Sequence, residues 1–151
     1  MINVDRKLEV NPADAEIQLS RQMVWDGLVR KAENAVPFVD AITTCDVLER
    51  DAEGFTREIV LNGETMREHI TFVPQERVIF DRLPGASAMG RIVNQIEEGA
   101  EGLVLRFIFD LDLVGAGPKE EAVFARSMEQ SYLAAVSTTL ERIRSEQSER
   151  A

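Results

Sequence analysis

The stretch FTREIVLNGETMREHITF, residues 55–72, has the pattern of a two-stranded β-hairpin. Its centre is Asn62-Gly63, the preferred pair for a two-residue type I′ turn. A turn of this length places Leu61 directly opposite Glu64 and thereby fixes the register of both strands. The hairpin therefore predicts which side chains of this stretch share a face of the sheet.

This register turns one pair of opposite charges inward. Arg57 falls opposite Glu68 on the face that carries the apolar residues of the hairpin, so we expect a cross-strand ion pair there. Glu58 and Arg67 pair on the other face, where an exposed ion pair is worth about 0–1 kcal/mol. The apolar neighbours of the inward pair are Phe55, Ile59, Met66, Ile70 and Phe72.

The next strand adds a second inward arginine. A turn at residues 74–76 that sets Val73 opposite Arg77 places Arg82 opposite Glu68. Arg82 is therefore predicted to lie beside the inward ion pair.

A fourth inward polar residue is Asn94. Pairing Ile96 with Leu103 across the acidic loop at residues 97–102 turns Ile92 and Asn94 toward the same face. Because buried unpaired charge is costly, such a polar set fits a cavity better than a solid apolar core. The alternatives are that the inward ion pair is a structural cross-link, or that the strand ends splay and their charged groups reach water.

Alternation of apolar and polar residues predicts seven strands. They lie at residues 2–10, 44–50, 55–61, 66–73, 77–83, 88–96 and 103–114. The last strand is the clearest, because apolar residues occupy every second position while Arg106, Asp110 and Asp112 fall on the other side. Short turns between consecutive strands predict an antiparallel sheet with one buried face.

Helical periodicity occurs near both ends of the chain. The first helix begins near Ser20, a suitable N-cap, and ends before Pro37. The second begins at Gly117-Pro118 and keeps an apolar face over about seven turns. We therefore predict an α+β fold in which a curved seven-stranded antiparallel sheet surrounds a long C-terminal helix, with shorter helices after the first strand.

Composition limits the classes of protein. The 151 residues, 44% hydrophobic and 29% charged, predict a single domain over residues 1–151. No apolar run approaches the roughly 20 residues of a membrane helix, and the start lacks a signal-peptide pattern, so we expect a cytoplasmic protein. The net charge of -10 argues against nucleic acid and anionic membranes as partners.

Few residues support catalysis or metal binding. Cys45 is the only cysteine, and His69, the only histidine, is predicted to point outward. We therefore expect no metal site and no cofactor. Tyr132, the only tyrosine, lies on the sheet-facing side of the last helix, either as a core aromatic or as a hydroxyl in the cavity.

Several short phrases resemble a known family. They are Trp25-Asp26-Gly27-Leu28, Lys31-Ala32-Glu33-Asn34, Ile42-Thr43-Thr44-Cys45 and Pro74-Gln75-Glu76-Arg77-Val78. The chain resembles the AtaL-like subgroup of the START and birch-pollen-allergen superfamily, SRPBCC, whose function is unassigned. The resemblance implies a helix-grip fold with a deep hydrophobic cavity between sheet and C-terminal helix. Some members of the superfamily are polyketide cyclases or lipid carriers.

Binding of a small hydrophobic or amphipathic ligand is the leading prediction, with the protein a monomer or homodimer. The predicted ligand-binding residues are Arg57, Glu68, Arg82, Asn94, Phe107, Phe109, Met128 and Tyr132. The alternative is a cyclase, dehydratase or hydrolase that uses Glu68 as general acid or base. A module that takes a partner helix in the groove is a third possibility.

Overall fold

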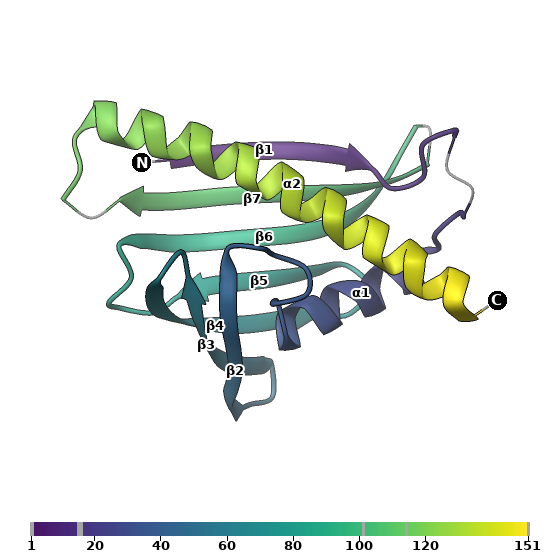
Figure 1. Cartoon of the computed structure of the whole chain (residues 1–151), viewed down its shortest axis with the longest axis horizontal. Helices are drawn as coiled ribbons and strands as arrows, with labels where there is room; N and C mark the ends of the chain where they lie inside the picture. The colour runs from purple at the N-terminus through teal and green to yellow at the C-terminus, as the bar shows by residue number, and fades with distance from the viewer. Residues whose placement is uncertain (1, 15–16, 101, 114, 151) are drawn as a thin grey trace.

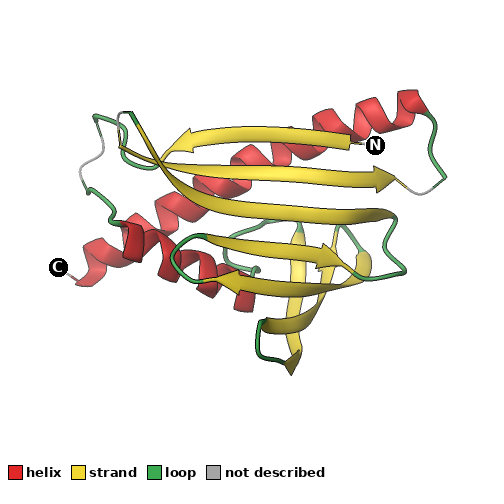
Figure 2. Ribbon diagram, turned by 180° about the vertical axis from the view of Figure 1, so that it is seen from behind, coloured by secondary structure: helices red, strands yellow, loops and turns green. Residues whose placement is uncertain are grey.

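The computed structural model of the chain describes residues 2–14, 17–100, 102–113 and 115–150. Within these residues the strands are β1 (Ile2–Glu9), β2 (Ile42–Arg50), β3 (Gly54–Leu61), β4 (Glu64–Val73), β5 (Arg77–Arg82), β6 (Ala88–Gly99) and β7 (Gly102–Leu113). The helices are α1 (Arg21–Glu33) and α2 (Pro118–Arg150). The strands form one antiparallel sheet in the order β1-β7-β6-β5-β4-β3-β2 (Figure 1), which Figure 2 shows from behind. The predicted fold class is confirmed, and the bounds agree to within about three residues.

The β3–β4 hairpin has the predicted register. Leu61 pairs with Glu64, and Arg57 pairs with Glu68. The turn residues Asn62 and Gly63 have φ of 50° and 81°, the positive values that a type I′ turn requires at both positions. The pairing of Glu68 with Arg82 across β4 and β5 is confirmed as well.

The predicted register between β6 and β7 is wrong by two residues. Ile96 pairs with Leu105 instead of Leu103, because the strands continue into the acidic segment 97–102 that was predicted to be a loop. Backbone pairing does not require apolar side chains, so polar residues extend the ladder where both faces reach water. A shift of two residues preserves the face of every side chain, and Asn94 is buried as predicted.

The long helix α2 crosses the concave face of the sheet diagonally (Figure 1). Its C-terminal half is packed tightly, with Val136, Leu140 and Ile143 buried, and it meets α1 there. Gly27 of α1 allows this close approach, because a Cβ atom at that position would lie 2.2 Å from Ile143 Cδ1. The N-terminal half packs less completely, and Val123 in it is 60% exposed.

Among the described residues, neither helix combines the length and the apolar character that crossing a membrane requires.

Candidate functional site

A cavity of about 140 Å³ lies between the concave face of the sheet and the N-terminal half of α2. Its apolar wall includes Ile59, Phe80, Ile92, Phe124 and Met128. The β-strand residues of this wall are buried and alternate with less buried residues on the outer face, so one face of the sheet can enclose an apolar space.

The mouth of the cavity is marked by lining residues that are also exposed. These are Asn62 in the β3–β4 turn and Ser127 and Ser131 on α2. The opening therefore lies between the tip of the hairpin and the N-terminal half of the helix.

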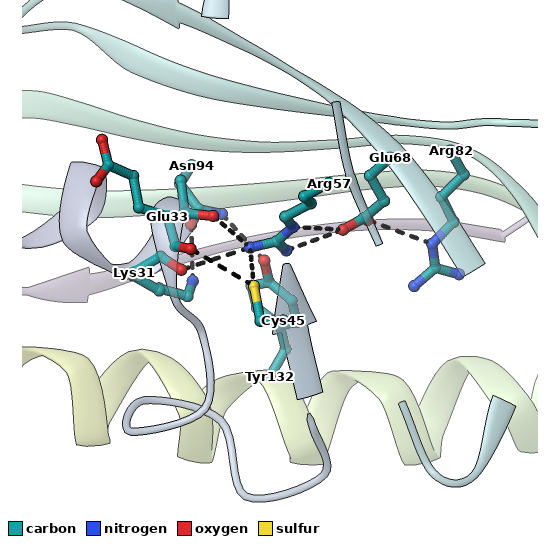
Figure 3. A network of polar contacts seen from close by, with 9 residues as sticks. Lys31, Glu33, Cys45, Arg57, Glu68, Arg82, Asn94 and Tyr132 are labelled. Carbon is teal, nitrogen blue, oxygen red and sulfur yellow. Dashed lines mark hydrogen bonds and ion pairs between the residues drawn. The ribbon is translucent and has the colours of Figure 1, made fainter. Parts of the chain in front are cut away.

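The centre of the polar lining is the ion pair between Arg57 and Glu68 (Figure 3). Arg57 Nε and Nη2 donate to Glu68 Oε1 at 3.1 and 2.8 Å, and Arg57 Nη1 donates to the Ala32 carbonyl at 2.9 Å. Arg57 and Glu68 are 4% and 2% exposed, so the pair is fully desolvated. Main-chain pairing of adjacent strands holds both residues in place.

Arg82 is the second guanidinium group in the cavity. Its Nη1 donates to the Ala88 carbonyl at 3.1 Å, while Nε lies 3.7 Å from Glu68 Oε2, too far for a hydrogen bond. Among the described residues, this buried Nε has no hydrogen-bond partner. An unsatisfied donor in a buried site is unfavourable, and a ligand acceptor would satisfy it.

Lys31 of α1 also lines the cavity and is 4% exposed. Its Nζ donates to Asn94 Oδ1 at 3.0 Å and lies 5.3 Å from the centre of the Tyr132 ring. Burial lowers the pKa of Lys31 to about 7; the charge of Arg57 lowers this pKa further, and Glu68 opposes the shift. A buried ammonium beside a guanidinium is strongly disfavoured, which explains the direction.

Sequence reasoning missed Lys31 as a site residue. The sequence analysis named it only within the phrase Lys31-Ala32-Glu33-Asn34 of the family resemblance. The spacing from Val24 and Leu28 could have identified it, since residues seven and three positions apart share the buried face of a helix.

Asn94 joins Lys31 to Tyr132. Its Nδ2 donates to the Tyr132 hydroxyl at 3.2 Å, while its Oδ1 accepts from Lys31. Tyr132 as a whole is half-buried, but burial of its hydroxyl raises the pKa of Tyr132 to about 12, an effect that the bond from Asn94 opposes. The phenol therefore keeps its proton at neutral pH.

The sequence pattern of one family, described as acetylaranotin biosynthesis cluster protein L (AtaL), matches residues 7–150. The chain belongs to the AtaL family. The resemblance found in the sequence is thereby confirmed. A comparison of this AtaL-family chain with curated proteins finds no match.

Solved structures share the fold of the AtaL-family chain. The di-domain ARO/CYC StfQ from the steffimycin biosynthetic pathway has a TM-score of 0.75 and 10% identity, over 97% of this chain and 52% of that chain. The Zhui aromatase/cyclase from Streptomyces sp. R1128 has a TM-score of 0.67 and 16% identity, over 94% of this chain and 93% of that chain. An uncharacterised protein from Bacillus thuringiensis has a TM-score of 0.65 and 14% identity, over 93% of this chain and 98% of that chain. The chain thus spans about half of StfQ, and at these identities the likeness confirms the helix-grip fold alone.

Five of the eight predicted ligand-binding residues of the AtaL-family protein line the cavity. They are Arg57, Glu68, Arg82, Met128 and Tyr132.

The other three predicted residues are not among the cavity-lining residues. Phe107 and Phe109 are fully buried, with their ring centres 5.3 and 4.4 Å from that of Tyr132, which itself lines the cavity. Asn94 is held by Lys31 and Tyr132, so its polar groups are engaged by these two side chains. The alternation of side chains along a strand predicted that all three face inward. It could not predict that all three contact Tyr132 of the long helix and are absent from the cavity lining.

The remaining polar candidates lie elsewhere. His69 points outward as predicted, with Nε2 2.8 Å from Asp51 Oδ2, and this contact lowers the pKa of Asp51. Cys45 is half-buried, with Sγ 3.8 Å from Arg57 Nη1. Within the described ranges, no group of three or more His, Cys, Asp or Glu is arranged to hold a metal ion.

Proposed function

We propose that this AtaL-family protein binds a small, mainly apolar molecule that carries an acidic oxygen and does not turn it over as an enzyme would. The ligand occupies the cavity between the sheet and the N-terminal half of α2. Its apolar part packs against the wall, and its acidic group meets the buried cations.

The observation that carries this proposal is an excess of positive charge in an enclosed apolar space. The cavity is lined by two guanidinium groups, those of Arg57 and Arg82, against a single carboxylate, Glu68. Lys31 adds a further positive charge in the half of the molecules in which its amine is protonated at pH 7. Arg82 Nε is a buried donor that lacks an acceptor among the described residues. A carboxylate or enolate on the ligand would supply both the missing acceptor and the missing negative charge.

The size of the cavity limits the ligand. Pockets for drug-sized molecules measure about 300–1,000 Å³, whereas an apolar cavity of about 150 Å³ is enough for benzene. The 140 Å³ found here fits one ring or the end of a longer molecule that extends through the mouth.

A cyclase-type enzyme, the class named for StfQ and Zhui, is favoured less by this geometry. It would use Glu68 as general acid or base, but Glu68 faces two guanidinium groups, and a proton on it would leave both without a counter-charge. Glu68 is better suited to neutralise Arg57 and to hold it in position.

Binding of benzoate and benzamide tests the proposal. These ligands have the same ring and nearly the same shape, and calorimetric titration should show that benzoate binds at least tenfold more tightly, because only benzoate brings a negative charge. Arg82→Met should remove most of this preference. Arg91→Met is the matched control, since Arg91 pairs with Asp81 on the outer face of the neighbouring strand.

Three results of this titration would contradict the proposal. They are no binding of either ligand, equal binding of both, or loss of the preference in Arg91→Met to the same extent as in Arg82→Met. Native mass spectrometry of freshly purified protein provides an independent check, because a retained natural ligand would add mass that denaturation removes.

The variant Glu68→Gln distinguishes the ligand-binding proposal from the enzyme alternative. Removing one partner of a buried ion pair costs about 3–5 kcal/mol, so the variant should be less stable, and benzoate should restore more of its melting temperature than it adds to the wild type. Glu58→Gln in the exposed pair of the same hairpin should change stability by about 1 kcal/mol or less.

The opposite pattern would favour catalysis. If the wild-type protein converts an aromatic polyketide and Glu68→Gln abolishes turnover without altering ligand affinity, Glu68 is a catalytic residue and the binder proposal is wrong.

A further inference from the structure

We propose that Lys31 is a nucleophilic amine that forms an imine with a small aldehyde or ketone held in the cavity. The inference rests on the proposed function, because the same cavity must admit the ligand. It adds one feature to the proposed ligand, namely a carbonyl group that lies close to the Lys31 amine.

The first support is the position of the amine. Lys31 extends from α1 into the cavity, where its Nζ lies 5.3 and 5.8 Å from the ring centres of Tyr132 and Phe80. Across the described residues, the ion pairs within 4.0 Å include none made by Lys31. The group therefore lies near two aromatic rings and donates a hydrogen bond to Asn94, and among the described residues it has no carboxylate within ion-pair distance.

The second support is the protonation state that this environment imposes. An exposed lysine has a pKa of about 10.4, so roughly 0.04% of it is neutral at pH 7. With a pKa of about 7, roughly half of Lys31 is neutral at the same pH. The nucleophilic form is thus about a thousandfold more populated than in an ordinary lysine.

The third support is the hydroxyl beside the amine. The Tyr132 oxygen accepts a hydrogen bond from Asn94 Nδ2, and its own proton is kept at neutral pH. A phenol that is protonated and within the same cavity can donate a hydrogen bond to the oxygen of a bound carbonyl. That bond would polarise the carbonyl carbon toward Nζ.

The reaction balances without any further reagent. The Nζ lone pair attacks the carbonyl carbon, a C–N bond forms, and one N–H proton moves to the carbonyl oxygen to give a carbinolamine. The second N–H proton leaves with that oxygen as water, and the C=N bond forms. The step is redox-neutral and requires neither an oxidant nor a reductant.

Reductive trapping with benzaldehyde tests the inference in the wild-type protein. Cyanoborohydride converts an imine into a stable secondary amine, so each labelled site gains the mass of the aldehyde less one oxygen atom. The chain has three lysines, Lys7, Lys31 and Lys119. Lys7 and Lys119 are both exposed and serve as internal controls. At pH 7, peptide mapping should find Lys31 labelled at least about tenfold faster than either control.

Two variants sharpen the result. Lys31→Met should lose this fast labelling, while Lys7→Arg combined with Lys119→Arg should keep it. Lys31→Arg retains a cation but cannot form the imine, and serves if Lys31→Met does not fold.

The inference is overturned if Lys31 labels no faster than Lys7 and Lys119. If benzoate still binds in that case, the proposed function stands and the imine alone is rejected. If neither benzoate nor benzaldehyde enters, both fail.

Discussion

Lys31 is buried without an ion-pair partner among the described residues, an arrangement that lysine rarely adopts. Burying it has a thermodynamic consequence as well as a chemical one. An unfolded lysine has a pKa of about 10.4, whereas the pKa of Lys31 in the folded protein is about 7. Between these values the unfolded chain binds a proton at this position and the folded protein does not, so the free energy of unfolding rises with pH.

The first prediction concerns this pH dependence. Lys31 should contribute about 2 kcal/mol to the increase in unfolding free energy between pH 7 and pH 9, and Lys31→Met should lack that contribution. Urea denaturation of both proteins at the two pH values measures it, and the difference between them removes groups common to both. Equal slopes with pH would show that Lys31 keeps an ordinary pKa.

The charges of the sheet were accessible to sequence reasoning because one turn fixes their register. Asn62-Gly63 sets Arg57 opposite Glu68, and the next turn brings Arg82 beside them. The burial of Lys31 was missed, because the rotation of α1 against the sheet was not determined. The spacing of Lys31 from Val24 and Leu28 carries that information.

At the level of elements, the packing of α1 against α2 depends on the absence of a side chain. Gly27 lies in the interior of α1, where glycine is less favourable than alanine by about 1 kcal/mol. It is tolerated because Ile143, which is fully buried, occupies the space where a Cβ would be.

Gly27→Ala should therefore destabilise the protein by about 1–3 kcal/mol despite its better helix propensity. Ile143→Ala removes the obstructing atoms, so the double variant should be more stable than the sum of the two single changes predicts. A double-mutant cycle by chemical denaturation measures this coupling. A stabilising effect of Gly27→Ala alone would refute it.

The strands and helices were predicted from the periodicity of apolar residues. The register of β6 with β7 was not predicted correctly. There the acidic residues 97–102 were read as a loop, although two exposed strand ends can pair whatever side chains they carry. Hydrophobic pattern limits where a buried strand runs, but it does not mark where an exposed ladder stops.

For the whole molecule, the two halves of α2 have different surroundings. The C-terminal half packs against α1 with buried apolar residues, whereas the N-terminal half spans the cavity. Local opening is easier where fewer apolar contacts must be broken.

Hydrogen exchange should reveal this difference. Backbone amides at residues 122–132 should exchange faster than those at residues 136–143, and saturation with benzoate should slow the first group selectively. Mass-resolved exchange on peptides from each half measures both effects. Uniform exchange along the helix, or equal protection of both halves by the ligand, would contradict the assignment of the cavity to the N-terminal half.

The strand wall and the helix wall of the cavity differ in how easily their side chains can be substituted without changing the backbone. The charged wall is fixed by the backbone hydrogen bonds between neighbouring strands, which carry Arg57, Glu68 and Arg82. Moving one of these charges would require a change in the register of the strands. Phe124 and Met128 project from a helix that makes no such ladder with its surroundings, and either can be enlarged or trimmed without altering a backbone hydrogen bond. Under the proposed function, a substitution in the helix wall would therefore change the size of ligand that fits, whereas the spacing of the charged groups that meet the acidic oxygen is set by the sheet.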